Sequence, residues 1–333
     1  MKRLFMTIAL TAMVTALAAP APADAKTTLR FGHSNSPTSP KGMAADLFAE
    51  LVAKYTSGRV EVKTFPSSQL GNNRKLFTAV KTRGIEMSIT PFPLLADIVP
   101  EYTTYTAGYF YENWDQLNKV IQHPALGQKW AKDLIEKGGL RVLGTYYYGA
   151  RNLTTAKTKV TKPADLKGLK IRAVPNEMSL GVVSGLGASP TPVAFAEAFQ
   201  AMRQGVVDGQ ENPLPTIWAQ KFFEVQKFLM MTRHQMIPEP YLINEKVWKK
   251  LSAEDKAALT KAAAEATAYN TAETIKFEAT LVDDLKAKGM TVVDADNLDL
   301  AAFRSAVRAE VIKRFDGPIW PKGTSQKVFD AIK

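Results

Sequence analysis

The sequence predicts an α/β protein of two domains, with one long helix lying across both of them. Two observations carry this prediction. Strand-like and helix-like apolar spacing alternate from residue 27 onward, and the same alternation starts again after Arg151. The segment 252–289 contains nothing that breaks a helix. A length of 333 residues is also typical of two domains rather than one.

The first unit alternates strands with helices. Apolar residues at every second position predict strands at 27–32, 60–65, 85–89 and 140–144. Helical spacing predicts helices at 43–58, 76–84 and 115–137, each ending at or just before a glycine. Helices placed between successive strands are typical of an open, mostly parallel sheet that is covered on both faces.

The second unit begins after Arg151 and has the same character. A short strand is expected at 170–173, where Pro175 ends it. Helices are expected at 178–186 and 197–204, and a further strand at 206–208. This unit is therefore interpreted as a second α/β domain.

The segment 252–289 predicts one uninterrupted helix. Ser252 and Asp255 approximate a capping box, and Gly289 supplies the stop. About 36 residues at 1.5 Å each give roughly 54 Å, more than the diameter of one small domain. A coiled coil is the alternative, but the helix is rich in alanine and lacks a sustained heptad of large residues. We expect it to pack on both domains.

Composition excludes several kinds of chemistry. A chain with no cysteine has no disulfide, zinc–thiolate or iron–sulfur site and no cysteine nucleophile. His33, His123 and His234 are far apart and lack the spacing of metal ligands, so neither metal nor cofactor is expected. The net charge of +11, from 43 Lys and Arg against 32 Asp and Glu, fits nucleic acid, an anionic membrane surface or anionic ligands.

The first 25 residues have the features of a secretory signal peptide. Lys2 and Arg3 precede an uncharged apolar run at 4–19, and small residues surround Asp24. A membrane anchor is the alternative, but this run is shorter than the ~20 residues that span a bilayer. We expect cleavage after Ala25 and export to the periplasm, which argues against a nucleic-acid partner.

Polar residues follow the ends of several predicted strands, where ligands bind in open α/β sheets. Ser34 follows the first strand, Thr90 the third, and Asn212 the strand at 206–208. Arg151 and Arg172 lie at two further strand ends, and an arginine fork binds a carboxylate through two parallel hydrogen bonds. A lone arginine more often forms an ion pair. Two arginines that converge with an asparagine form a candidate anion site.

Motifs for catalysis are missing from the sequence. It contains neither a GxSxG elbow nor a GxxxxGK[ST] phosphate loop. Glu211, close to Asp208, is interpreted as part of a loop rather than as a catalytic acid. Tyrosines at 146–148 precede Arg151, in a pattern that mostly indicates packing. A secreted enzyme acting on a small carboxylate is the alternative to a binding protein.

Several motifs occur together in a specific order and spacing. They are FPSSQLG at 65–71, then LKGLKIR, GASPTP and GVVDGQENP within 164–213, and KFFEVQKFLMMTRH at 221–234. In this combination the chain resembles the periplasmic solute-binding proteins of TRAP (tripartite ATP-independent periplasmic) transporters, over essentially all of its length after residue 25. The resemblance implies a two-domain periplasmic-binding-protein fold, with a ligand cleft between the domains and a long helix spanning both.

The resemblance also implies which residues bind the ligand. Arg172 stands in the K-x-R motif whose arginine binds a carboxylate, and Arg151 matches a frequent second arginine. The other expected ligand-binding residues are Asn212, Phe195, Ser34, Thr90, Phe92 and Tyr148. The segments 90–93 and 107–111 depart from the family pattern and make the cleft more apolar. That departure favours a compact acid, such as a dicarboxylate, a 2-oxo acid or an aromatic acid.

The resemblance further implies domain limits and partners. The expected domains are 26–149 with about 238–277, and 150–237 with about 278–333. The expected partners are a small carboxylate ligand and the membrane permease subunits of a TRAP transporter. We expect the protein to act as a monomer.

Overall fold

A single nine-stranded sheet runs through the computed structural model, which describes residues 26–333. The expected signal peptide at 1–25 lies outside the described residues. The strand order is β2-β1-β3-β8-β4-β7-β5-β6, with β9 paired to β8. The strands are β1 Thr27–Gly32, β2 Val60–Phe65, β3 Met87–Ile89, β4 Leu140–Thr155, β5 Lys170–Ala173, β6 Ser189–Pro192, β7 Gly209–Pro213, β8 Phe228–Asn244 and β9 Thr291–Val293.

Parallel pairs lie toward the two ends of the sheet and antiparallel pairs at its centre, except that β9 is parallel to β8. β1 is parallel to β2 and β3, and β5 is parallel to β6 and β7. β8 is antiparallel to β3 and β4, and β4 is antiparallel to β7. The prediction of a mostly parallel sheet is therefore wrong at the centre. The chain enters the second unit along β4 and returns along β8, so these two strands must run in opposite directions.

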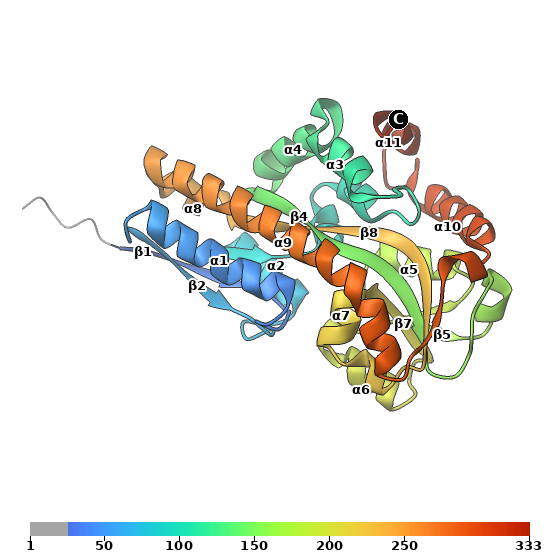
Figure 1. The fold of residues 1–333 in the computed structure, drawn as a ribbon. Coiled ribbons are helices and arrows are strands. Elements are labelled where there is room, and N and C mark those ends of the chain that lie inside the picture. Colours follow the sequence, from blue (N-terminus) through green and yellow to red (C-terminus); the bar gives the residue numbers. More distant parts are fainter. Residues whose placement is uncertain (1–25) are drawn as a thin grey trace, which may run out of the picture.

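β4 and β8 form a long ribbon that joins the two domains. Leu140 pairs with Asn244 at one end, and Thr155 pairs with Phe228 at the other. Irregularities in the register, one of them next to Gly149, bend the pair, as β-bulges do. Figure 1 shows both strands curving together behind the long helix. The strand expected at 140–144 is the first part of β4, whereas β8 was not predicted.

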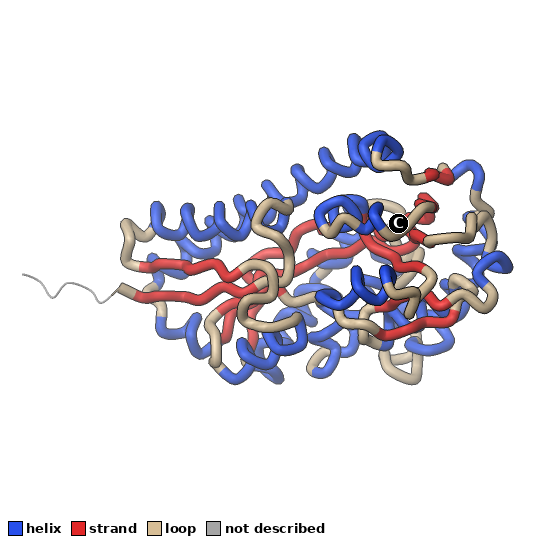
Figure 2. Tube along the Cα trace, turned by 90° about the horizontal axis from the view of Figure 1, so that it is seen from below, coloured by secondary structure: helices blue, strands red, loops and turns tan. Residues whose placement is uncertain are grey.

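Helices cover both sides of the sheet, as Figure 2 shows. None of them within residues 26–333 combines the length and the apolar character needed to cross a membrane. The helices are α1 Pro40–Tyr55, α2 Asn73–Thr82, α3 Trp114–Gln122, α4 Lys129–Gly138, α5 Glu177–Gly185, α6 Ala198–Arg203, α7 Leu214–Ala219, α8 Glu245–Lys250, α9 Ala253–Ala287, α10 Leu300–Phe315 and α11 Thr324–Ala331.

Two predicted elements differ from the structure. The helix expected at 115–137 is two helices, α3 and α4, because Pro124 has no N–H to donate and interrupts the helical ladder. Asn113 caps α3 by accepting a hydrogen bond from the Gln116 backbone N–H. The strand expected at 206–208 is a turn, and β7 starts only at Gly209.

The long helix is confirmed as α9. The Ser252 hydroxyl accepts a hydrogen bond from the Asp255 backbone N–H at 3.0 Å, which fixes its start. Buried alanines in its first half allow close packing against α1 and β4. Leu281 and Leu285, in its second half, belong to a separate core beside α7. The helix thus packs on both ends of the sheet (Figure 1).

Gly149 lies where β4 bends against α9. Its φ of +130° is unusual for any residue with a side chain, and an added Cβ would lie 2.5 Å from Cβ of Pro213. The Glu278 carboxylate of α9 accepts hydrogen bonds from the Ala150 N–H at 2.8 Å and the Tyr147 hydroxyl at 2.9 Å. This bend is therefore held by both the backbone conformation and α9.

We expect Gly149→Ala to lower the free energy of unfolding by about 3 kcal/mol, the sum of unfavourable backbone conformation and steric overlap. Gly168→Ala is the matched control. Its φ is +84°, but an added Cβ would meet no atom within 4 Å, so a loss of only about 1 kcal/mol is expected. Urea unfolding measures both, and equal losses would contradict the steric argument.

Candidate functional site

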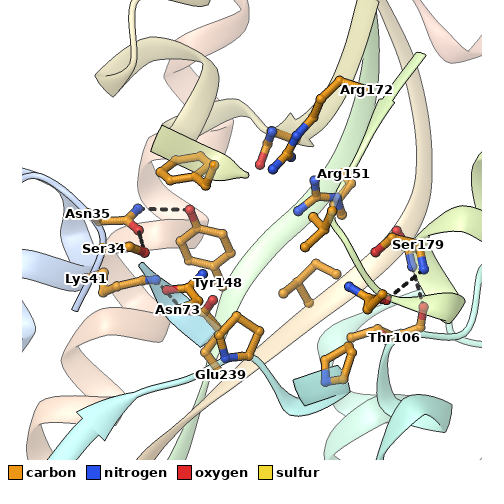
Figure 3. A pocket seen from close by; sticks show the side chains of 18 residues that line it. Ser34, Asn35, Lys41, Asn73, Thr106, Tyr148, Arg151, Arg172, Ser179 and Glu239 are labelled. Carbon is orange, nitrogen blue, oxygen red and sulfur yellow. Dashed lines mark hydrogen bonds and ion pairs between the residues drawn. The ribbon is translucent and has the colours of Figure 1, made fainter. Parts of the chain in front are cut away.

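A cavity of about 60 Å³ lies where the ends of β1, β3 and β5 face the middle of the β4–β8 ribbon. Figure 3 shows its lining side chains. Most of them are polar or charged: Ser34, Asn35, Lys41, Asn73, Thr106, Tyr148, Arg151, Arg172, Asn176, Ser179, Asn212, Gln235 and Glu239. The apolar lining residues are Pro91, Pro93, Val174, Phe195 and Ile237.

A second, wider cavity, of about 360 Å³, continues from the first. The two share lining residues from both domains, among them Ser34, Asn73, Val174 and Phe195. The second cavity adds mainly small and apolar residues. A ligand with several carbon atoms beyond its anionic group therefore has room.

Arg172 carries an unpaired positive charge into the cavity. It lies on β5, its side chain is fully buried, and Nε donates to the carbonyl oxygen of Val193 at 3.0 Å. Both terminal nitrogens, Nη1 and Nη2, lack a hydrogen-bond partner within residues 26–333. Burial, and then the nearby Arg151, lower the pKa of Arg172 to about 10. The guanidinium therefore stays charged at neutral pH and presents two unsatisfied donors.

Arg151 also reaches the cavity, but its charge is already compensated. From β4 it donates hydrogen bonds to both carboxylate oxygens of Glu211 on β7, with Nη2 2.8 Å from Oε1. Nε2 of His234 lies 3.2 Å from Oε2 of the same carboxylate. All three side chains are buried. The interpretation of Glu211 as part of a loop is therefore wrong.

This buried cluster has unusual titration properties. Burial raises the pKa of Glu211, but the attraction of Arg151 and the contact with His234 outweigh it and hold this pKa at about 2. Burial lowers the pKa of His234, which keeps its ring neutral around pH 7. Near neutral pH the cluster is an ion pair with a neutral histidine beside it.

Hydrogen bonds fix several other lining side chains. The Asn35 amide donates to the Tyr148 hydroxyl at 2.9 Å, and this hydroxyl lies 2.5 Å from Oγ1 of Thr216. The Asn212 amide donates to Gln210 at 2.5 Å. These contacts orient polar groups around the cavity before any ligand arrives.

The structure brings most of the expected site residues to one cavity. Arg172, Arg151, Asn212, Phe195, Ser34 and Tyr148 line it, and their part in ligand binding stays a prediction. Thr90 and Phe92 do not line it, which corrects the expectation. Thr90 is buried and bonded to Ser88 at 2.7 Å, and Phe92 packs edge-on against Tyr105 in the core. Pro91 and Pro93, the residues next to them in the chain, line the cavity instead.

Sequence reasoning missed several lining residues. Gln235, Ile237 and Glu239 lie on β8, which was not predicted. Asn176 and Ser179 form the start of α5, where the Asn176 side chain accepts from the Ser179 N–H. The Asn-x-x-Ser pattern after Pro175 was the signal that marks this helix start. Within residues 26–333, no three His, Asp or Glu side chains are grouped to hold a metal ion.

Comparison with known proteins agrees with this architecture. Residues 31–316 match the family described as DctP, bacterial extracellular solute-binding protein, family 7. A TRAP periplasmic solute-binding protein from Roseobacter denitrificans, solved with L-galactonate, is 32% identical with a TM-score of 0.84 over 92% of this chain and 99% of that one.

Two further proteins have other ligands in their names. A TRAP solute-binding protein from Polaromonas, solved with D-erythronate, is 33% identical with a TM-score of 0.85 over 92% of this chain and 98% of that one. The C4-dicarboxylate-binding periplasmic protein of Rhodobacter capsulatus is 34% identical over 78% of this chain and 77% of its own. The members of this family serve transport by binding solutes and are not enzymes.

The two-domain mixed sheet, the long spanning helix and the match over most of the chain lead to one assignment: the chain belongs to the DctP family of periplasmic solute-binding proteins of TRAP transporters.

Proposed function

We propose that this protein binds a hydroxyl-rich monocarboxylate, a sugar acid, in the periplasm and delivers it to a TRAP membrane permease. The observation that carries the proposal is the buried guanidinium of Arg172, whose two terminal nitrogens have no partner among the described residues. A buried, unpaired charge is unfavourable until an opposite charge binds it. A carboxylate matches the two parallel donors of this fork.

The charges around the cavity favour a ligand with a single negative charge. Lys41, Arg151 and Arg172 are its cations. The carboxylate of Glu239, with Oε2 2.6 Å from Nζ of Lys41, compensates the charge of Lys41, and the carboxylate of Glu211 compensates the charge of Arg151. One positive charge is left, on Arg172, and a monoanion neutralises it. A second carboxylate would have no free cation to meet there, and Arg74, which lines the second cavity, is paired with Asp97 at 2.7 Å.

The rest of the lining favours hydroxyl groups over an apolar body. Amide, hydroxyl and carboxylate side chains line the cavity, and Phe195 with four proline or aliphatic residues forms the rest of its wall. Such groups offer both donors and acceptors, which several hydroxyls can satisfy. We therefore propose a sugar acid as the ligand, in place of the compact dicarboxylate, 2-oxo acid or aromatic acid that the sequence favours. The ligands of the Roseobacter and Polaromonas proteins are sugar acids of the proposed kind.

Delivery requires the two domains to move around the ligand. We place the domains at 26–149 with about 238–277, and at 150–237 with about 278–333, with the cavity between them. Closure of such domains around a ligand creates a surface that the open protein lacks. We propose that the permease recognises this closed form of an exported monomer whose signal peptide is removed after Ala25.

A thermal-shift screen tests the proposed ligand class. We expect galactonate or erythronate, at about 100 times its dissociation constant, to stabilise the protein by about 2.7 kcal/mol and to raise the melting temperature by roughly 5 °C or more. Succinate, a 2-oxo acid and an aromatic acid are the comparison ligands. A larger shift with any of these three, and none with the sugar acids, would overturn the proposal.

A further inference from the structure

Besides Arg151 with Glu211 there is a second buried ion pair, and both of its members line the cavity. Nζ of Lys41, from α1, lies 2.6 Å from Oε2 of Glu239 on β8, and both side chains are almost completely buried. The Tyr146 hydroxyl donates to the same Oε2 at 2.8 Å. Lys41 also lies over the Tyr148 ring, 4.6 Å from its centre. Lys41 is therefore occupied on two sides and is not a free cation for the ligand.

The other oxygen of this carboxylate is free. Both contacts of Glu239 are made to Oε2, and no hydrogen bond from residues 26–333 reaches Oε1. Glu239 nevertheless lines the cavity. An ionised carboxylate only accepts hydrogen bonds. The group that meets Oε1 must therefore be a donor, and a hydroxyl is a donor whereas a second carboxylate is not.

Glu239 and Arg172 lie on different sides of the cavity. Figure 3 shows Arg172 at the top of the view and Glu239 at the bottom, with Tyr148 between them. A ligand whose carboxylate binds Arg172 thus extends its other end toward Glu239. A carboxylate at that other end would meet the like charge of Glu239, and because Glu239 is buried, water would screen their repulsion only weakly.

We propose that Glu239 determines the charge specificity of this protein: it accepts a hydrogen bond from a distal hydroxyl of the ligand and excludes acids that carry a second carboxylate there. This inference rests on the proposed function and adds to it a residue that rejects diacids. Specificity of this kind uses an unfavourable contact with the wrong ligand as well as a favourable one with the right ligand.

Pairs of acids with the same carbon skeleton test the inference. Galactonate and galactarate differ only in whether the last carbon is a hydroxymethyl group or a carboxylate, and erythronate and meso-tartrate form the shorter pair. We expect calorimetry to show that the wild-type protein binds the monoacid at least 100-fold more tightly than the diacid of the same pair, for whichever pair it binds. In Glu239→Gln, Lys41 is released to bind the second carboxylate, and this preference should fall to tenfold or less.

Two further variants keep the outcome interpretable. Glu245→Gln is the matched control, because Glu245 is buried and paired with Arg141 at 2.7 Å but does not line the cavity. It should keep the wild-type preference. If Glu239→Gln does not fold, Lys41→Met/Glu239→Gln removes the whole ion pair, and its preference for the monoacid should also fall at least tenfold.

The outcomes separate this inference from the proposed function. A wild-type protein that binds a monoacid, together with Glu239 variants that keep its full preference, would overturn the inference alone. Equal wild-type affinity for both members of a pair would do the same. A protein that binds neither monoacid, or binds a diacid more tightly, would overturn the proposed function and the inference with it.

Discussion

Replacing Arg172 with methionine should abolish ligand binding and at the same time stabilise the empty protein. Removing one member of a buried charge pair costs about 2–5 kcal/mol of binding energy, so affinity should fall by roughly a thousandfold. The empty protein holds two buried donors without partners, and their removal should raise the free energy of unfolding by about 1–3 kcal/mol. A methionine of similar length fills most of the space.

Calorimetry with a bound sugar acid and urea unfolding without it measure the two effects. Arg141→Met is the matched control, because Arg141 makes a bidentate ion pair with Glu245 outside the cavity. It should keep ligand affinity and lose stability, the reverse of Arg172→Met. Arg172→Lys should regain only part of the affinity, because an ammonium group lacks the fork. Unchanged affinity in Arg172→Met would rule out its proposed role.

Glu211→Gln should be among the most destabilising single changes around the cavity. It leaves Arg151 buried without a counter-charge, next to the unpaired Arg172, which costs about 3–5 kcal/mol. Arg151→Met/Glu211→Gln removes both charges and should recover most of this loss. Urea unfolding of the two variants at pH 7 measures the difference. Equal losses in the single and double variants would contradict a charge-based explanation.

The stability difference between the wild type and Glu211→Gln should also depend on pH, and its direction follows from the pKa of Glu211. The pKa of Glu211 is held at about 2 in the folded protein, below its ordinary value of 4.5, so its ionisation stabilises the fold above pH 4.5. That contribution is lost as the pH falls from about 4.5 toward 2. The stability difference between wild type and Glu211→Gln should therefore shrink by about 1.4 kcal/mol per pH unit in this range. A constant difference would show that the carboxylate does not titrate as described.

His234 adds to the acid sensitivity of the wild-type protein. Its folded pKa lies below 6.5, so the unfolded chain binds a proton first as the pH falls, and stability decreases from about pH 6.5 downward. This effect has the same sign as that of Glu211 but begins at higher pH. The two contributions are therefore separable along the pH axis.

Local patterns predicted the elements that depend on local chemistry. The strand ranges 27–32, 60–65 and 170–173 agree with β1, β2 and β5, and the start of α9 follows its Ser252 cap. β8 was missed because it is buried along most of its length, so it has no alternation of apolar and polar residues, and it includes two prolines.

The candidate site was predictable only in part. Arg172 was found because a charged residue at the end of a short strand is conspicuous. The partner of Arg151 was not found, since Glu211 is 60 positions away along the chain and becomes its neighbour only when β4 pairs with β7. Lys41 and Glu239 come together from α1 and β8 in the same way. Which charges stay unpaired depends on tertiary pairing, and the proposed charge of the ligand rests on it.

The β4–β8 ribbon has a consequence for the cooperativity of folding. Its backbone ladder extends from Leu140 and Asn244 to Thr155 and Phe228 and joins both domains into one hydrogen-bonded sheet. Neither domain can lose its central strands without exposing those of the other. Tyr148, Arg151, Gln235 and Glu239, which line the cavity, lie near the middle of these strands. We therefore expect the two domains to unfold as a single cooperative unit, and a ligand bound in the cavity to stabilise that unit at the segment both domains share.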